Sequence, residues 1–307
     1  MNTRFLETLV VLARVGSFRE TAQVLNATQA AISQRIANLE DDLGVELVDR
    51  SQRRLTLTAA GEQAVRQAQR MLELERALRA STRPEAPPAG RVRLGAIESV
   101  VRTWLSPLVR LLAERHPQVD LDIMVDTARN LQEAFRARKL DLMVQNDPYP
   151  AAVGNIDHRV TPLCEFSLHW IARPELAPTR GPLSLEQLER VPLLTFSRTS
   201  SPQAHVRALF ADRGLEPRVC SFPSVESIIQ LVRDGYGIAA IPPVFVGADL
   251  AAGTLRLCEG PALPSMTITA ISERDAPSAV QAAQALTAEV VARYCTDQGS
   301  AWVRPLG

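Results

Sequence analysis

The chain has 307 residues, with 34 basic and 34 acidic side chains that give a formal net charge of zero. An overall electrostatic attraction to nucleic acid is therefore excluded, and any binding to DNA requires basic residues gathered on one face. At this length, and with 46% hydrophobic residues, the sequence predicts two or three domains with substantial cores.

Two helices separated by a very short turn are predicted near the start of the chain. The first begins after Ser17, a good N-cap, and carries apolar residues at helical spacing. The second begins after Thr28, keeps a single apolar stripe as far as Leu43 and ends at Gly44. Helices joined by so short a turn cross steeply, as in a helix-turn-helix.

Polar side chains lie off the apolar stripe of the second helix, mostly near its N-terminal end. In a DNA major groove, Gln suits adenine, Arg suits guanine, and Ser bonds a base or a phosphate. The alternative is an ordinary solvated helix face, and the two helices alone do not decide between these interpretations. The DNA-contacting candidates on this helix are Thr28, Gln29, Ala30, Ser33, Gln34 and Arg35.

The following segment, residues 44–62, predicts a β-hairpin wing. A short apolar strand over 45–48 leads into a polar, arginine-rich turn, and apolar residues alternate again at Leu55 and Leu57. Arginine side chains at a wing tip meet phosphates or enter the minor groove, where the negative potential favours a guanidinium. The candidates for DNA contact in the wing are Arg50, Arg53 and Arg54.

These N-terminal motifs resemble those of the LysR-type transcriptional regulators. The matching stretches are "FLETLVVLARVGSFRETAQVLNATQAAISQRIANLEDDLGVELVDR" and "RRLTLTAAGE", in the order that the family has them. Ala30 stands where the family generally has proline, and Val48 where it generally has phenylalanine. Neither change removes a hydrogen-bonding group, so we expect the fold of the family. The two changes do not allow the family's base preference to be assigned to this chain. The resemblance implies a transcriptional regulator whose partner is double-stranded promoter or operator DNA.

A long helix is predicted over residues 59–80, with Thr58 as its cap. A narrow apolar seam runs along it amid Gln, Arg and Glu. A lone helix cannot bury such a seam, so we expect a homodimer through this linker helix. The resemblance further implies that the effector-binding domains pair separately, which gives a homotetramer. The seam consists of Val65, Ala68, Met71, Leu72, Leu74 and Leu78.

Residues 81–90 contain three prolines and end in glycine, which predicts a hinge and a domain boundary. Strands and helices alternate beyond it, and this pattern predicts an open α/β sheet with parallel pairing. The expected elements are strands over 91–97, 119–125 and 140–145 with helices over 103–115 and 131–138, then strands over 166–172, 192–196, 218–222, 237–243 and 266–272, and a closing helix over 278–294.

The expected fold is multi-domain: an all-α winged helix-turn-helix with a long linker helix, followed by a two-lobed α/β domain. The resemblance implies an effector-binding domain similar to periplasmic solute-binding proteins, with the effector held between the lobes. The expected parts are a DNA-binding domain over 1–58, a dimerisation helix over 59–80, a hinge over 81–90 and an effector-binding domain over 91–307, in which lobe I spans 91–163 and 266–307 and lobe II spans 164–265.

Two strand-to-helix junctions are expected to face each other across this cleft, because ligands of open α/β sheets bind at the carboxyl ends of strands. Ser99 offers a hydroxyl, with the free N–H groups of Val100 and Val101, to an anion such as a small carboxylate. The ordinary alternative, that the junction serines only cap helices, is compatible with this role. The candidate effector-binding residues are Glu98, Ser99, Val100, Thr127, Gln145, Asn146, Phe196, Ser197, Arg198, Thr199, Ser200, Phe222 and Val225.

Glu98 complicates this prediction, because a carboxylate beside an anion site repels an anion. Either its side chain points away from the ligand, or the effector also carries an amino or ring-nitrogen group.

No catalytic or metal-binding pattern is found in the sequence. A nucleophile elbow, a P-loop and a His-Glu metal pattern are all missing, and the four histidines are scattered. We therefore expect no enzyme activity, no cofactor and no metal. The cysteines show no metal spacing, and a redox-sensing pair is only a minor alternative. They are Cys164, Cys220, Cys258 and Cys295.

The sequence also indicates where the protein works. No charged-then-apolar leader opens the chain and no long apolar run crosses it, so we expect a cytoplasmic protein that does not bind membranes. The alternative function is a cytoplasmic small-molecule-binding protein or enzyme that uses its N-terminal helices only for dimerisation. The arginine-rich wing and the missing secretion signal favour the regulator.

Overall fold

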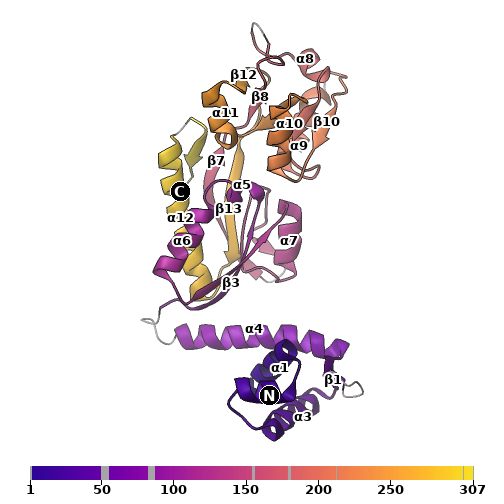
Figure 1. The fold of residues 1–307 in the computed structure, drawn as a ribbon, viewed down its shortest axis with the longest axis vertical. Coiled ribbons are helices and arrows are strands. Elements are labelled where there is room, and N and C mark those ends of the chain that lie inside the picture. The colour runs from indigo at the N-terminus through magenta and orange to yellow at the C-terminus, as the bar shows by residue number, and fades with distance from the viewer. Residues whose placement is uncertain are drawn as a thin grey trace. The chain divides into compact units, whose positions relative to one another are not determined.

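In the computed structural model the chain forms two compact units, residues 1–86 and 87–307 (Figure 1). The predicted hinge falls at the division between them, and its residues 82–86 lie outside the described part of the chain. The structure describes residues 2–49, 55–81, 87–153, 156–178, 181–211, 213–299 and 301–306.

The N-terminal unit is a helix-turn-helix followed by two short wing strands and a long helix. The side chains of Asn2, Ser17 and Thr28 cap the first three helices by accepting a hydrogen bond from a backbone N–H of the first turn. Gly16 and Gly44 end α1 and α3 in the left-handed conformation, at φ of 75° and 69°. The elements are α1 (Thr3–Val15), α2 (Phe18–Val24), α3 (Gln29–Leu43), β1 (Val48–Asp49), β2 (Thr56–Leu57) and α4 (Ala59–Ser81).

The core of this unit joins leucines of α1 to Ile36 and Leu39 of α3 and to Ala68 of α4. Val65 and Leu72 of α4 pack against the same core. The prediction of one continuous seam along α4 is therefore wrong in its first half, because the helix covers those side chains within its own unit. The exposed remainder is Met71, Leu74 and Leu78, whose exposed fractions are 39%, 69% and 65%.

The two wing strands pair antiparallel, with Val48 opposite Leu57. Val48 is only 2% exposed, so the smaller side chain is still covered at this position. The Glu40 carboxylate of α3 accepts hydrogen bonds from the N–H groups of Leu47 and Val48 at 2.9 and 3.2 Å, which ties the end of α3 to the first wing strand. The predicted wing tip, with Arg50, Arg53 and Arg54, lies outside the described residues.

Lobe I of the second unit is built on a mixed sheet in the order β14-β7-β13-β5-β3-β4. α6 and α12 lie together on one side of this sheet, and α7 lies on the other (Figure 1). The elements are β3 (Gly90–Ala96), α5 (Glu98–Val101), α6 (Leu105–Arg115), β4 (Val119–Val125), α7 (Ala128–Arg136), β5 (Leu142–Gln145), β6 (Ala152–Val153), β7 (Ile156–Phe166), β13 (Met266–Glu273), α12 (Ser278–Gln298) and β14 (Val303–Pro305).

Lobe II contains a five-stranded sheet in the order β10-β9-β11-β8-β12. The chain enters it between β7 and β8 and returns between β12 and β13, which makes the two predicted crossovers. The elements are β8 (His169–Ala172), α8 (Leu185–Glu189), β9 (Leu193–Thr195), α9 (Ser201–Ala211), β10 (Val219–Ser221), α10 (Val225–Arg233), β11 (Ile238–Ile241), the 3-10 helix η1 (Pro243–Val246), α11 (Gly247–Ala252) and β12 (Arg256–Cys258).

The sheets differ from the prediction in pairing and in one long strand. β3 pairs in parallel with β4 and β5 as predicted, but β13 runs antiparallel to β5 and β7. The 11-residue strand β7 is missing from the prediction because Pro162 interrupts its pattern and cannot donate a ladder hydrogen bond. The pairing with β13 shifts register between Ile268 and Thr269, where Thr269 lies opposite Pro162.

Helix boundaries in lobe I also differ from the prediction. The helix expected over 103–115 begins only at Leu105, because the separate short helix α5 precedes it. The helix expected over 131–138 begins at Ala128, where Thr127 is its cap. Among the described residues, no helix is both long enough and apolar enough to span a bilayer.

Candidate functional site

Helix α3 presents a polar face that its packing leaves free. Ile32, Ile36 and Leu39 are fully buried on one side of the helix. Thr28 uses its hydroxyl as the N-cap, and Ala31 donates the N–H to it at 3.2 Å. The first turn contains no acidic residue. The exposed residues near this end are Thr28, Gln29, Ala30, Ser33 and Gln34.

Arg35 lies differently from the other predicted contact residues. It is half-buried, and its Nη1 donates to the Thr8 hydroxyl of α1 at 3.4 Å. The guanidinium therefore joins α3 to α1 in this structure. Gln34 donates from Nε2 to Oδ1 of Asn38 at 2.8 Å, one turn further along the exposed face.

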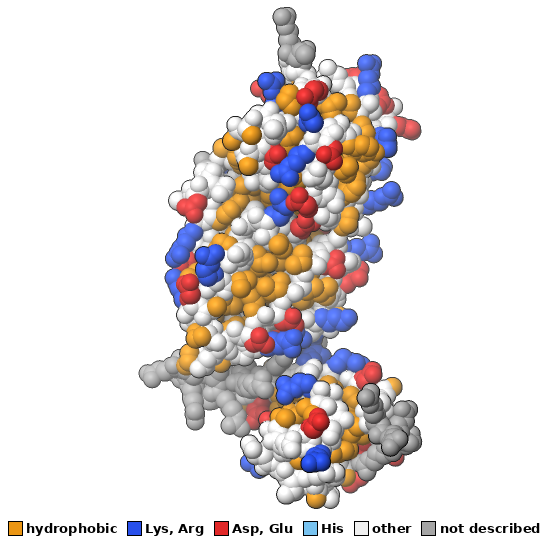
Figure 2. Space-filling view, in the orientation of Figure 1, with side chains coloured by type: hydrophobic (Ala, Val, Ile, Leu, Met, Phe, Trp, Pro, Cys, Tyr) orange, Lys and Arg blue, Asp and Glu red, His pale blue; other side chains and the backbone are white. Residues whose placement is uncertain are grey.

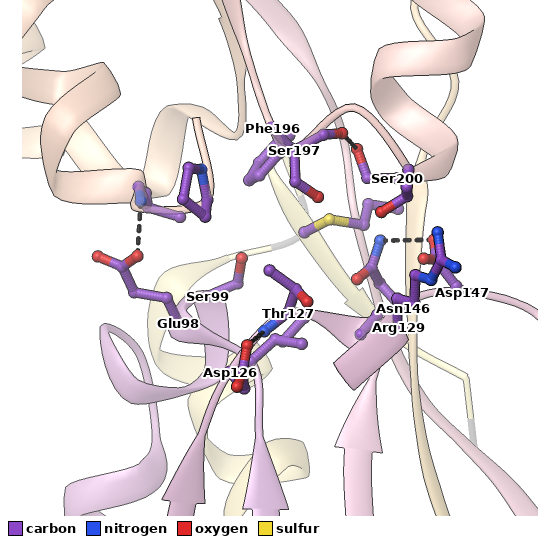
Figure 3. A pocket seen from close by; sticks show the side chains of 16 residues that line it. Glu98, Ser99, Asp126, Thr127, Arg129, Asn146, Asp147, Phe196, Ser197 and Ser200 are labelled. Carbon is purple, nitrogen blue, oxygen red and sulfur yellow. Dashed lines mark hydrogen bonds between the residues drawn. The ribbon is translucent and has the colours of Figure 1, made fainter. Parts of the chain in front are cut away.

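The second unit contains a pocket between its lobes (Figure 3). Lobe I lines it with the ends of β3, β4 and β5 and the starts of α5 and α7, and lobe II lines it with the loop after β9 and the start of α10. The free volume is about 40 Å³, which is room for a few water molecules. The lining residues are Ile97, Glu98, Ser99, Asp126, Thr127, Ala128, Arg129, Asn146, Asp147, Phe196, Ser197, Thr199, Ser200, Pro223, Val225 and Met266.

Nine of the thirteen predicted effector-site residues line this pocket: Glu98, Ser99, Thr127, Asn146, Phe196, Ser197, Thr199, Ser200 and Val225. The other four do not. Val100 is buried in the core, and Arg198 is exposed. Gln145 is buried and hydrogen-bonded to the backbone of Asp147, and Phe222 packs against the core.

Sequence reasoning misses three charged residues of the pocket: Asp126, Arg129 and Asp147. Asp126 and Asp147 are sequence neighbours of predicted residues, and Arg129 lies in the first turn of α7, just after the predicted Thr127. Asp126 directly precedes Thr127 at the end of β4, and Asp147 directly follows Asn146 at the end of β5. Ligands of such sheets bind at the carboxyl ends of the parallel strands, so every polar residue at these ends, acidic ones included, is a candidate.

The Glu98 carboxylate crosses from lobe I to the first turn of α10 in lobe II (Figure 3). It accepts hydrogen bonds from the N–H groups of Val225 and Glu226 at 2.6 and 3.1 Å and from the Ser224 hydroxyl at 3.3 Å. The positive end of the helix dipole stabilises the charge. The Arg102 guanidinium of lobe I also pairs with Glu226.

The backbone at the start of α5 differs from the prediction. The N–H groups of Val100 and Val101 both donate to the Ile97 carbonyl, at 3.0 and 3.3 Å, so they are not free to bind an anion. The Ser99 hydroxyl is free: the residue is 3% exposed, and its Oγ has no hydrogen-bond partner among the described residues. It points into the pocket (Figure 3).

Ser200 acts as a helix cap at the opposite side of the pocket. Its hydroxyl donates to the Ser197 carbonyl at 2.7 Å and accepts from the Gln203 N–H at 3.4 Å, in the first turn of α9. The next residue, Ser201, donates from both N–H and hydroxyl to Oδ1 of Asp147, at 3.2 and 2.8 Å. Asp147 thereby makes a second bridge between the lobes.

Comparison with known protein families agrees with both units. Residues 3–62 match the model described as the bacterial regulatory helix-turn-helix protein, lysR family. Residues 85–293 match the LysR substrate binding domain, and this match covers more than half of the chain. The chain belongs to the LysR family.

Individual members of the LysR family are similar along most of the chain. DgdR of Burkholderia cepacia is 31% identical over 284 residues, which cover 91% of this chain and 90% of DgdR. PtxR of Pseudomonas aeruginosa is 30% identical over 293 residues, 92% of this chain and 90% of PtxR. The structure of a full-length OxyR variant from Pseudomonas aeruginosa has the same fold, with a TM-score of 0.66 at 23% identity over 95% of this chain and 94% of that chain.

Membership of the LysR family establishes the general function. The protein is a DNA-binding transcriptional regulator with an effector-binding domain, and it is not an enzyme. The alternative of a binding protein or enzyme with N-terminal helices used only for dimerisation is wrong, because those helices match the family's DNA-binding model.

Three of the four cysteines of this LysR-family protein do not have the environment of reactive thiols. Burial raises the pKa of the Cys164, Cys258 and Cys295 thiols above the ordinary range. The thiolate is the reactive form, so a raised pKa disfavours oxidation at these positions.

Replacing Glu98 with Gln tests the bridge between the lobes. The amide loses the negative charge that two backbone N–H groups and the α10 dipole stabilise, so we expect the free energy of unfolding to fall by about 1–2 kcal/mol. Trp104, Trp170 and Trp302 all lie in the second unit, so tryptophan fluorescence during urea denaturation reports on that unit alone. Glu114→Gln, at an exposed position of α6, is the matched control, and an equal loss in both variants would show that the bridge is not the cause.

Proposed function

We propose that a small organic acid binds between the two lobes of the second unit and thereby controls DNA binding by the first. The observation that carries this proposal is Ser99: the residue is only 3% exposed, and its hydroxyl lacks a partner among the described residues and points into the pocket. Buried hydroxyls are normally hydrogen-bonded, so such a group is suited to a ligand.

The remaining hydrogen-bond donors around Ser99 suit a carboxylate. Thr127 and Asn146 approach from lobe I, and Thr199 approaches from lobe II. Arg129, and not the predicted Arg198, lines the pocket and supplies the positive charge. A guanidinium forms strong charge-assisted hydrogen bonds with a carboxylate. Its Nε also donates to Glu133 at 3.2 Å, and this contact holds the side chain along α7.

Contact with both lobes gives the effector a means of control. A ligand shifts a conformational equilibrium only by the difference in its affinity for the two states. An acid that touches Ser99 in lobe I and Thr199 in lobe II binds one arrangement of the lobes better than others. We propose that this arrangement is passed on to the DNA-binding units of the oligomer.

For DNA recognition we propose that α3 enters the major groove and the wing contacts the backbone or minor groove. Gln29, Ser33 and Gln34 are exposed near the N-terminal end of α3, where polar side chains reach base edges. Arg50, Arg53 and Arg54 remain the proposed wing contacts. Because the chromosome is its target, the protein works in the cytoplasm.

For assembly we propose a homodimer through α4 and a tetramer through the second unit. Met71, Leu74 and Leu78 follow a three-to-four spacing and are exposed, which suits a helix pair. In lobe I, β4 is an edge strand whose Ile123 and Met124 are both exposed. Hydrophobic side chains also gather over the second unit on the face shown in Figure 2. Exposed edges and apolar patches of this kind are typical of interfaces.

These roles divide the chain as the sequence suggested. We propose DNA binding by residues 1–58, dimerisation by 59–80, a hinge over 81–90 and effector binding by 91–307. The first half of the dimerisation helix also completes the core of the DNA-binding unit. A change in the angle between paired α4 helices would therefore reposition both recognition helices.

Replacing Gln29 with Ala tests the base-reading role. We expect a loss of about 1–3 kcal/mol at one operator position with non-specific binding unchanged. Arg53→Ala with Arg54→Ala should instead weaken binding to every sequence and flatten its salt dependence. Gel shifts on DNA upstream of the protein's own gene and on random DNA measure both. Gln69→Ala, at an exposed position of α4, is the control, and equal losses of Gln29→Ala on both DNAs would refute base reading.

Replacing Leu74 with Asp tests the dimer. The variant places a charge in the exposed α4 seam, so we expect at least about tenfold weaker dimerisation and loss of specific DNA binding. Light scattering at micromolar concentration measures the state, with Gln69→Asp off the seam as the control. Leu72→Asp is unsuitable, because Leu72 packs in the core of its own unit. A monomeric wild-type protein would contradict the dimer.

Replacing Ser99 and Thr199 together with Ala tests the effector site. Two hydrogen bonds to a charged group are lost, so we expect roughly 10- to 100-fold weaker binding of an acid effector, with effector-free DNA binding unchanged. Calorimetry with a panel of carboxylates and their neutral amides makes the measurement. The control is Ser278→Ala with Thr296→Ala, at two exposed positions of α12. Equal affinity of acid and amide, or of double variant and wild type, would rule out this carboxylate site.

A further inference from the structure

We propose that the effector carries a positively charged amino group beside its carboxylate, and that Asp126 and Asp147 bind this amino group. The inference deepens the proposed function and rests on its pocket between the lobes. It comes from three features of the described residues: resident carboxylates at the helix N-termini, an excess of acidic side chains, and the free Ser99 hydroxyl.

Besides the short helix α5, three longer helices begin at the pocket, and each of these three N-termini already holds a carboxylate of the chain. Glu98 occupies the first turn of α10. Asp147 accepts from the Ser201 N–H and hydroxyl at the start of α9. Asp126 accepts at Oδ1 from the Thr127 N–H and the Asn130 amide at the start of α7, both at 2.7 Å. The helix dipoles that attract anions are therefore used within the protein and do not recruit the effector.

Two of these carboxylates each have one oxygen that can still accept hydrogen bonds. Oδ2 of Asp126 and Oδ2 of Asp147 make no hydrogen bond among the described residues, and both side chains line the pocket. Arg129 is the basic residue of the lining, and it already pairs with Glu133. Three acidic side chains against one guanidinium repel an effector that is only an anion, whereas an ammonium group brings positive charge and donors together.

The Ser99 hydroxyl is an independent sign that a ligand completes the pocket. The residue is only 3% exposed, and its Oγ is unpartnered among the described residues and directed into the pocket (Figure 3). A hydroxyl both donates and accepts, so it serves a ligand that has a carboxylate and an ammonium close together. The free volume of about 40 Å³ favours a compact head group. The chemical class is an amino acid or a similar short amino-carboxylate.

Calorimetry on the full-length protein tests this inference with matched compounds. Glycine, alanine, serine and 4-aminobutyrate are each compared with the acid that lacks the amino group and with the amide that lacks the carboxylate. We expect an amino acid of this set to bind at least about tenfold more tightly than its acid without the amino group. If no amino compound binds, or if the acids without the amino group bind equally well, the inference is overturned.

Two conservative variants locate the amino group. Asp126→Asn and Asp147→Asn keep an oxygen for the bonds to α7 and α9 but lose the charge, so each should weaken amino acid binding about tenfold and should not weaken binding of the simple acids. Asp275→Asn, in the exposed turn after β13, is the control. Unchanged amino acid affinity in both variants would overturn the assignment, and the wild-type series decides the ligand class if a variant fails to fold.

The same series separates the inference from the proposed function. If the amino amides bind as tightly as the amino acids, the amino group is recognised and the carboxylate site is wrong. If the simple acids bind as tightly as the amino acids, the carboxylate site stands and the amino group has no role.

Discussion

The second unit depends on a carboxylate that lies across the gap between its lobes. Glu98 stands at the end of the first strand of lobe I, and its carboxylate oxygens accept hydrogen bonds from the start of α10 in lobe II. The two crossovers tether the lobes, but connections of this kind still allow them to tilt. The hydrogen bonds of Glu98 to α10 and of Asp147 to Ser201 of α9 join the lobes in the arrangement of this structure. Together with the Arg102–Glu226 ion pair, these contacts join the two lobes beside the pocket.

This arrangement explains how a small ligand can control the protein. The contacts between the lobes stabilise the closed arrangement without any effector. The effector then shifts the equilibrium by the difference between its binding free energies for the closed and the open arrangement. A ligand that competes with the bridges opens the lobes, and one that adds contacts beside them tightens the closed form. Because the pocket is narrow, small changes in lobe position alter every contact that its lining residues make.

In the N-terminal unit, one helix contributes to two parts of the structure. Helix α4 contributes Val65, Ala68 and Leu72 to the core of the DNA-binding unit and continues beyond it with exposed apolar residues. The recognition helix and the proposed dimer contact are thus parts of one rigid framework. Arg35 adds a polar tie between α3 and α1, so the orientation of α3 is fixed by both apolar packing and a hydrogen bond.

The sequence by itself determined the family, the helix-turn-helix and the junctions after β3 and β9, because local caps, apolar spacing and motif order are short-range properties. It also placed Ser99 and Thr127 correctly at the pocket. Only the tertiary structure decided where Glu98 points, since its partners lie more than a hundred residues away in the chain. The same holds for Asp147, for the covering of Val65 and Leu72, and for β7, whose Pro162 is tolerated only because β13 shifts register opposite it. Contacts between distant segments depend on the packing of whole lobes, which no local pattern records.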